Sequence, residues 1–264
     1  MSRGLGDVYK RQTILPTNQG EGVGFRPGKC TWENAAAFPY DVYGGFQKKE
    51  QTVAVAIVLE DAYNRVQFKL LMDLLIQYGV SLTLTQWAAG MPLKRTVSVV
   101  MKLGNWSSAP HQLTMGLPQG SPLSPVFFNV YTKGLADLNQ NGPSKILTQA
   151  DDRLINIYKT SKDFQEVAEA VQQQLDSVSK WCHHTRSLLN PDMAQTLWCT
   201  LDNRAAGKPM PAVTFDGAVA ERTSHLRYLG IHFERMLTYR KHMEATALKC
   251  KKGLSVMKAT SAEY

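Results

Sequence analysis

The stretch that decides the fold is residues 115–125, with the sequence MGLPQGSPLSP. Glycine permits unusual backbone angles and proline fixes one of them, so the stretch predicts a rigid loop. Ser121 is a suitable helix N-cap and Pro122 a suitable first helical residue, so we expect a helix to begin there. Further along the chain, a pair of adjacent acidic residues, Asp151 and Asp152, interrupts an otherwise apolar segment.

The acidic pair has flanks that predict a hairpin. Residues 145–149 and 154–158 are short apolar arms, and we expect them to pair and carry Asp151 and Asp152 at their tip. Adjacent carboxylates repel each other, and a divalent cation relieves that repulsion. Mg²⁺ prefers oxygen ligands and is the usual ion of phosphoryl transfer. The pair therefore predicts a magnesium site, although a pair exposed on the surface is an alternative that the sequence leaves open.

The other elements follow from hydrophobic periodicity. A continuous apolar run at residues 53–59 predicts a buried strand, and apolar residues at 3–4 spacing predict a helix over residues 164–182. We expect further helices at residues 32–42, 66–79, 82–89 and 238–257. We expect further strands at residues 95–103, 195–200 and 226–233. A hairpin is expected at Asp216–Gly217 and a turn at residues 190–192. This order predicts an α+β fold, with an antiparallel sheet backed by helices.

The composition indicates a globular protein that binds a polyanion. Of the 264 residues, 44% are hydrophobic and 20% charged, and the formal net charge is +8. The basic balance favours nucleic acid first and an anionic membrane second. The four cysteines are scattered and form no Cys-x-x-Cys pair, which is typical of a reducing compartment. No apolar run reaches the roughly 20 residues of a membrane helix, and no signal peptide opens the chain, so we expect an intracellular protein of nucleus or cytoplasm that is not secreted.

These motifs resemble those of a known family. The stretch at 115–125 is similar to the Leu-Pro-Gln-Gly motif of reverse transcriptases, and its Ser-Pro-Leu-Ser-Pro continuation resembles the non-long-terminal-repeat retrotransposon branch. Residues 150–152 resemble that branch's Ala-Asp-Asp box. Three further segments resemble motifs of the same branch, in the same order along the chain. Residues 24–28 (GFRPG) resemble the fingers motif, residues 62–66 (AYNRV) resemble the end of the first palm motif, and residues 228–230 (YLG) resemble the primer-grip region.

The resemblance implies an RNA-directed DNA polymerase that transfers nucleotides to a primer 3′ end with two Mg²⁺ ions, or Mn²⁺. Its partners would be an RNA template, a DNA primer and deoxynucleoside triphosphates. It also implies metal ligation by Asp151 and Asp152, nucleotide binding by Asp61, Ala62, Tyr63, Gln119 and Gly120, and nucleic-acid binding by Arg26, Lys29, Tyr228, Leu229 and Gly230. In particular, Tyr63 would exclude a 2′-hydroxyl.

The resemblance also divides the chain into parts. We expect residues 1–18 to be a non-native or disordered leader and residues 19–52 a partial fingers region. Residues 53–235 would form the polymerase palm, and residues 236–264 the start of a truncated thumb.

The chain departs from the family pattern at a catalytic position. The family has a metal-binding aspartate five residues before the aromatic gate, and counting back from Tyr63 that position holds Val58. Glu60 is on the same strand face as Val58 but about 6.6 Å further along the strand. Replacement of the missing metal-binding carboxylate by Glu60 or Asp61 is therefore a weaker alternative. Met193 and Gln149 also replace residues that the family prefers. We therefore expect an impaired polymerase. Alternatives are a nucleic-acid-binding protein without catalysis, a metal-dependent nuclease, and a decayed element fragment.

Overall fold

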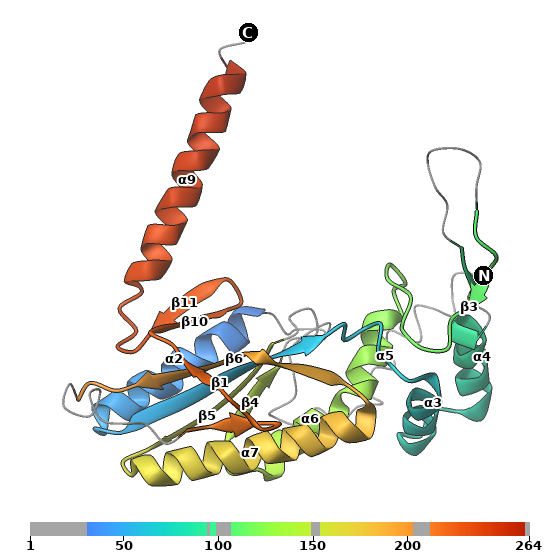
Figure 1. Cartoon of the computed structure of the whole chain (residues 1–264), viewed down its shortest axis with the longest axis horizontal. Helices are drawn as coiled ribbons and strands as arrows, with labels where there is room; N and C mark the ends of the chain where they lie inside the picture. The colour runs from blue at the N-terminus through green and yellow to red at the C-terminus, as the bar shows by residue number, and fades with distance from the viewer. Residues whose placement is uncertain (1–30, 94–95, 99–106, 149–153, 203–211, 262–264) are drawn as a thin grey trace.

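A mixed sheet forms the centre of the molecule (Figure 1). The computed structural model describes residues 31–93, 96–98, 107–148, 154–202 and 212–261. Within these ranges the largest sheet has the strand order β4-β5-β1-β6-β9. The strands are β1 (Gln51–Glu60), β4 (Lys145–Thr148), β5 (Leu154–Ser161), β6 (Leu188–Cys199) and β9 (Glu221–Arg222). Pairing is antiparallel except between β6 and β9, so the predicted antiparallel sheet is confirmed for all but its short edge strand.

The central strand β1 is buried on both faces. Val53, Val55 and Ile57 pack against α7 (Phe164–Thr185), which crosses one face of the sheet as predicted. Ala54 and Ala56 face the other side, where they pack against α2 (Thr31–Gln47) and the hairpin of β10 (His225–Tyr228) and β11 (Ile231–Glu234). Burial on both faces explains why this strand is an unbroken apolar run rather than an alternating one.

A separate apolar cluster lies beyond one end of the sheet, to the right in Figure 1. It joins the helices α3, α4 and α5, whose contacts include Leu71, Ala88 and Phe127. The remaining elements are α3 (Phe68–Gln77), α4 (Leu82–Leu93), α5 (Ser124–Tyr131), α6 (Lys133–Asn141), α9 (Arg240–Ser261), β2 (Thr96–Val97), β3 (His111–Gln112), β7 (Thr214–Phe215) and β8 (Ala218–Val219). In Figure 1, α9 projects away from the rest of the molecule.

Three predicted elements differ from the structure. The helix expected to begin at Pro122 begins at Ser124, because the chain between Pro118 and Ser121 makes a turn first. The strand expected at 226–233 is a hairpin, whose turn at Leu229 and Gly230 has φ values of 50° and 79°. The turn expected at 190–192 lies inside β6, where the pairing with β1 shifts register between Ala56 and Val58, as at a β-bulge.

Candidate active site

The candidate site begins where β1 emerges from the core. Val58 and Glu60 are partly exposed, whereas Leu59 between them is buried, so one face of the strand opens at this edge. Val58 pairs with Leu154 of β5 and with Asn190 of β6. The predicted metal ligands Asp151 and Asp152 lie outside the described residues, as do Arg26 and Lys29.

The carboxylates at this edge belong to Glu60 and Asp61, whereas Val58 carries no oxygen in its side chain. The side-chain amide of Asn190 donates a hydrogen bond to Glu60 Oε1 at 2.7 Å, which holds that carboxylate toward β6. Asp61 is exposed and has a φ of 46°, and its carbonyl accepts from the Arg65 amide at 3.0 Å. The chain therefore turns sharply after Glu60. The sequence indicated Asn190 as part of a turn and as the start of a segment that resembles the family motif after the acidic hairpin, but not its contact with Glu60.

The predicted gate residue Tyr63 is held from two sides. Its ring stacks on Phe128 of α5, with centroids 4.5 Å apart and planes inclined by 13°. Its backbone carbonyl accepts a hydrogen bond from the Leu117 amide at 2.8 Å. The structure thus brings Tyr63 against both α5 and the loop that precedes it, a contact between two motifs far apart in the sequence.

The loop at residues 115–125 is fixed at both ends. The Gly116 amide donates to the Val66 carbonyl at 2.9 Å, and Gly116 has a φ of +90°. The Ser121 amide and the Ser124 hydroxyl both donate to the Pro118 carbonyl, at 3.2 and 2.6 Å. Between these anchors Gln119 and Gly120 are exposed, Gly120 with a φ of +91°. The loop therefore presents Gln119 and Gly120 to solvent beside the segment that carries Tyr63.

The buried hydroxyl of Tyr131 links α5 to the segment that follows Tyr63. Tyr131 of α5 donates to the Thr185 carbonyl at 2.5 Å and accepts from the Gln67 amide at 3.3 Å. Burial raises the pKa of Tyr131, so its hydroxyl stays protonated and remains a donor. This one side chain joins α5, the end of α7 and the segment after Tyr63. The sequence showed Tyr131 only as an apolar helix position.

The predicted primer-grip residues lie on the β10–β11 hairpin. The Tyr228 ring is buried against the face of the sheet that α2 covers, while Gly230 is exposed at the turn. Beside the hairpin, the rings of His225, His232 and His242 lie in a row between β10–β11 and α9. Burial, followed by the charges of His225 and other neighbouring basic groups, lowers the pKa of His232.

No group of three or more His, Cys, Asp or Glu side chains in the described part of the chain could hold a metal ion. The metal assignment therefore depends on Asp151 and Asp152. Among the helices of the described ranges, none is long and apolar enough to cross a membrane.

The comparison with protein families decides the identity. The model described as "Reverse transcriptase (RNA-dependent DNA polymerase)" matches residues 3–233. The chain belongs to the reverse transcriptase family. The match begins within residues 1–18, and the division of the chain into leader, fingers, palm and thumb stays a prediction.

Similar proteins include polymerases of insect transposons. The chain is 28% identical to the probable RNA-directed DNA polymerase from transposon BS of Drosophila melanogaster, over 93% of this chain and 27% of that protein. It is 30% identical to the RNA-directed DNA polymerase from mobile element jockey of Drosophila funebris, over 48% of this chain and 14% of that protein. This reverse transcriptase chain thus spans about a quarter or less of these relatives, and the predicted non-long-terminal-repeat type is confirmed.

Solved structures confirm the palm fold. Apo telomerase from Candida tropicalis, truncated from its C-terminal domain, superposes with a TM-score of 0.59 over 89% of this chain and 44% of that chain, at 12% identity. Telomerase of the same organism in complex with the TWJ fragment of telomeric RNA gives a TM-score of 0.58 over 89% of this chain and 36% of that chain, also at 12% identity. At this identity the likeness concerns the fold alone, and the predicted α+β reverse transcriptase palm is correct.

Proposed function

We propose that this chain is an RNA-directed DNA polymerase domain of a retrotransposon, and that Val58 impairs this copy. Its reaction would extend a DNA primer on an RNA template with deoxynucleoside triphosphates. The observation that carries the proposal is the edge of β1, where Val58 lies beside the strand that follows the acidic pair. Family membership supports the reaction class, and the apolar side chain at this edge supports the impairment.

Asp151 and Asp152 are the proposed metal ligands, and chain connectivity supports them. Leu154, the partner of Val58, follows Asp152 by two residues, which span at most about 7 Å of extended chain. Mg²⁺ is commonly bound by one or two carboxylates, with waters and substrate phosphates completing its shell, so the pair fits this ion or Mn²⁺. When bound, two such ions would neutralise the charge on the attacking and leaving oxygens.

Tyr63 and the loop at 115–125 are the proposed nucleotide site. The Tyr63 ring, fixed by its stack on Phe128, would block the space of a 2′-hydroxyl. Gln119 and Gly120 would contact the incoming nucleotide from the exposed turn, and the backbone at Asp61 and Ala62 would lie near its triphosphate. Arg26 and Lys29, and the hairpin residues Tyr228, Leu229 and Gly230, would bind template and primer.

Val58 explains why we expect weak catalysis. A valine supplies no oxygen to a metal ion. Glu60, on the same strand face, accepts a hydrogen bond from Asn190 instead. Metal ions contribute several kcal/mol to the stabilisation of a transition state, so poor metal placement should cost roughly a hundredfold or more in rate.

A second candidate function is nucleic-acid binding without catalysis. The same Val58 favours it, together with the net charge of +8 and the exposed lysines of α9. With this second function, the chain would bind primer–template in a salt-dependent manner and show no Mg²⁺-dependent turnover.

Primer extension on an RNA template with Mg²⁺ separates the two functions. We expect little extension by the unmodified chain, and gain of extension by Val58→Asp that is lost again on adding Asp151→Asn. Binding of primer–template by all three proteins is the control for folding. If Val58→Asp binds but never extends the primer, the binding function replaces the polymerase function.

A further inference from the structure

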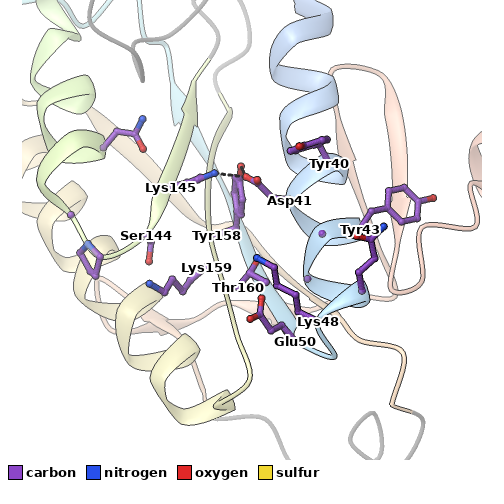
Figure 2. Close-up of a pocket in the computed structure, with 16 residues that line it drawn as sticks. Tyr40, Asp41, Tyr43, Lys48, Glu50, Ser144, Lys145, Tyr158, Lys159 and Thr160 are labelled. Carbon is purple, nitrogen blue, oxygen red and sulfur yellow. Dashed lines mark hydrogen bonds and ion pairs between the residues drawn. The ribbon is translucent and has the colours of Figure 1, made fainter.

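We propose that the groove between α2 and the base of the β4–β5 hairpin binds an unpaired stretch of nucleic acid (Figure 2). The groove has a volume of about 810 Å³, which is within the usual range of ligand sites. One wall is the C-terminal part of α2, and the other is formed by the α6–β4 connection and β4. Tyr158 and Thr160 of β5 line it between these walls.

The groove has a rigid frame. The Asp41 carboxylate of α2 accepts hydrogen bonds from Lys145 of β4 at 2.6 Å and from Tyr158 of β5 at 2.7 Å, as the dashed lines in Figure 2 mark. Burial and the adjacent Asp41 charge raise the pKa of Tyr158, so this hydroxyl stays a donor. At Gly45 the helix approaches β5 so closely that a Cβ would lie 2.6 Å from Thr160 Cγ2. The two walls are therefore fixed relative to each other.

The charge that remains in the groove is positive. Asp41 is neutralised by Lys145, whereas Lys48 and Lys159 make no ion pair with another described residue. Glu50 is the remaining acidic side chain of the lining. The two ammonium groups suit the phosphates of a strand.

An exposed aromatic ring, that of Tyr40, distinguishes this groove from a simple basic patch. Tyr40 lines the groove and is 79% exposed. Tyr43 is turned toward the β10–β11 side, where its hydroxyl donates to the Leu237 carbonyl at 3.0 Å. Exposed rings beside lysines are the usual construction of single-strand sites, because an unpaired base can stack on a ring. The bases of a duplex are already stacked and paired, so a duplex would gain only the ionic contacts.

The groove lies apart from the candidate active site. Thr160 pairs with Thr52, and Leu154 pairs with Val58 six residues further along β1, which is about 20 Å of strand. The proposal is therefore independent of catalysis, and loss of polymerase activity leaves it standing. The groove would give a second contact to a strand that also crosses the active-site edge, or would bind a separate segment of the same RNA.

Fluorescence anisotropy of a labelled single-stranded RNA, with the full chain, tests the proposal. We expect Tyr40→Ala to weaken binding about tenfold, because a stacking partner is lost. Lys159→Gln should lower the dependence of log K on log salt by about 0.7, the value for one phosphate contact on a single strand. Lys180→Gln removes the same charge from α7, across the sheet, and should leave the affinity within about twofold. Because Tyr40 is highly exposed, the first variant should fold normally.

Crosslinking then locates the bound strand. A 4-thiouridine RNA should crosslink to α2 or β5 in the groove, and excess unlabelled duplex or poly-glutamate should compete poorly. The proposal is overturned if Tyr40→Ala and Lys159→Gln bind like Lys180→Gln, or if crosslinks map only outside the groove. Equal competition by poly-glutamate would also overturn it, since the groove would then recognise negative charge alone.

Discussion

Replacing Gly116 by alanine tests whether the loop at 115–125 is locked to the segment that carries Tyr63. Gly116 has a φ of +90°, and a Cβ there would lie 2.9 Å from the Asn64 carbonyl oxygen and 3.1 Å from Asn64 Cα. Both neighbours are backbone atoms, so the loop itself must move. Movement weakens the hydrogen bonds from Gly116 to Val66 and from Leu117 to Tyr63.

Gly120 provides a matched control for this substitution. Its φ of +91° is nearly the same, but a Cβ there would have nothing within 4 Å. Both alanines should therefore cost about 1–2 kcal/mol for the left-handed backbone. Gly116→Ala should cost a further 1–3 kcal/mol or so, because two backbone hydrogen bonds of about 0.5–1.5 kcal/mol each are strained.

Urea unfolding at equilibrium, followed by circular dichroism, measures this difference. We expect the free energy of unfolding to be lower for Gly116→Ala than for Gly120→Ala by about 1–3 kcal/mol, with similar m-values. Equal losses in the two variants, or a larger loss for Gly120→Ala, would refute the contact between the loop and Asn64.

Three further predictions concern single side chains. Tyr131→Phe should lower the free energy of unfolding by about 1–3 kcal/mol, because the buried Thr185 carbonyl loses its donor, and an unchanged urea midpoint would contradict this. The pKa of His232 is lowered in the folded chain, so the unfolded chain binds more protons. The free energy of unfolding should therefore fall as the pH drops from about 7.5 to about 5.5. The variant His232→Gln should reduce that fall, and an unaltered pH profile would show that other groups cause it. In a Val58→Asp background, Tyr63→Val should increase ribonucleotide incorporation relative to deoxyribonucleotide incorporation, and an unchanged ratio would remove Tyr63 from the gate role.

The sequence predicted the elements that local patterns specify. The apolar run of β1 and the 3–4 spacing of α7 were correct because burial selects those residues directly. The hairpin at Asp216–Gly217 was also correct, since both residues have positive φ values, 46° and 81°, as an Asp-Gly type I′ turn requires.

Elements that depend on distant contacts were missed. Leu229 adopts a positive φ that leucine rarely adopts, so the β10–β11 hairpin looked like one continuous strand. Asn190 looked like part of a turn, but pairing with β1 and the hydrogen bond to Glu60 keep it in β6. In the same way, no local pattern could show that Phe128 stacks on Tyr63 or that Tyr131 joins three segments.

The groove beside α2 shows the same limit. Tyr40, Lys48 and Lys159 are unremarkable in sequence, because tyrosine and lysine are common on helix and strand surfaces. They become a candidate site only when α2 packs across β5 at Gly45 and the α6–β4 connection closes the other side.

We propose that Val58 limits the activity of this polymerase palm. Single-turnover primer extension on an RNA template with Mg²⁺ tests it most directly, comparing the unmodified chain with Val58→Asp at equal occupancy of primer–template. We expect Val58→Asp to extend the primer at least a hundredfold faster, which corresponds to about 2.7 kcal/mol. Equal rates in the two proteins, both abolished by Asp151→Asn, would contradict it, because another group would then already complete the metal site.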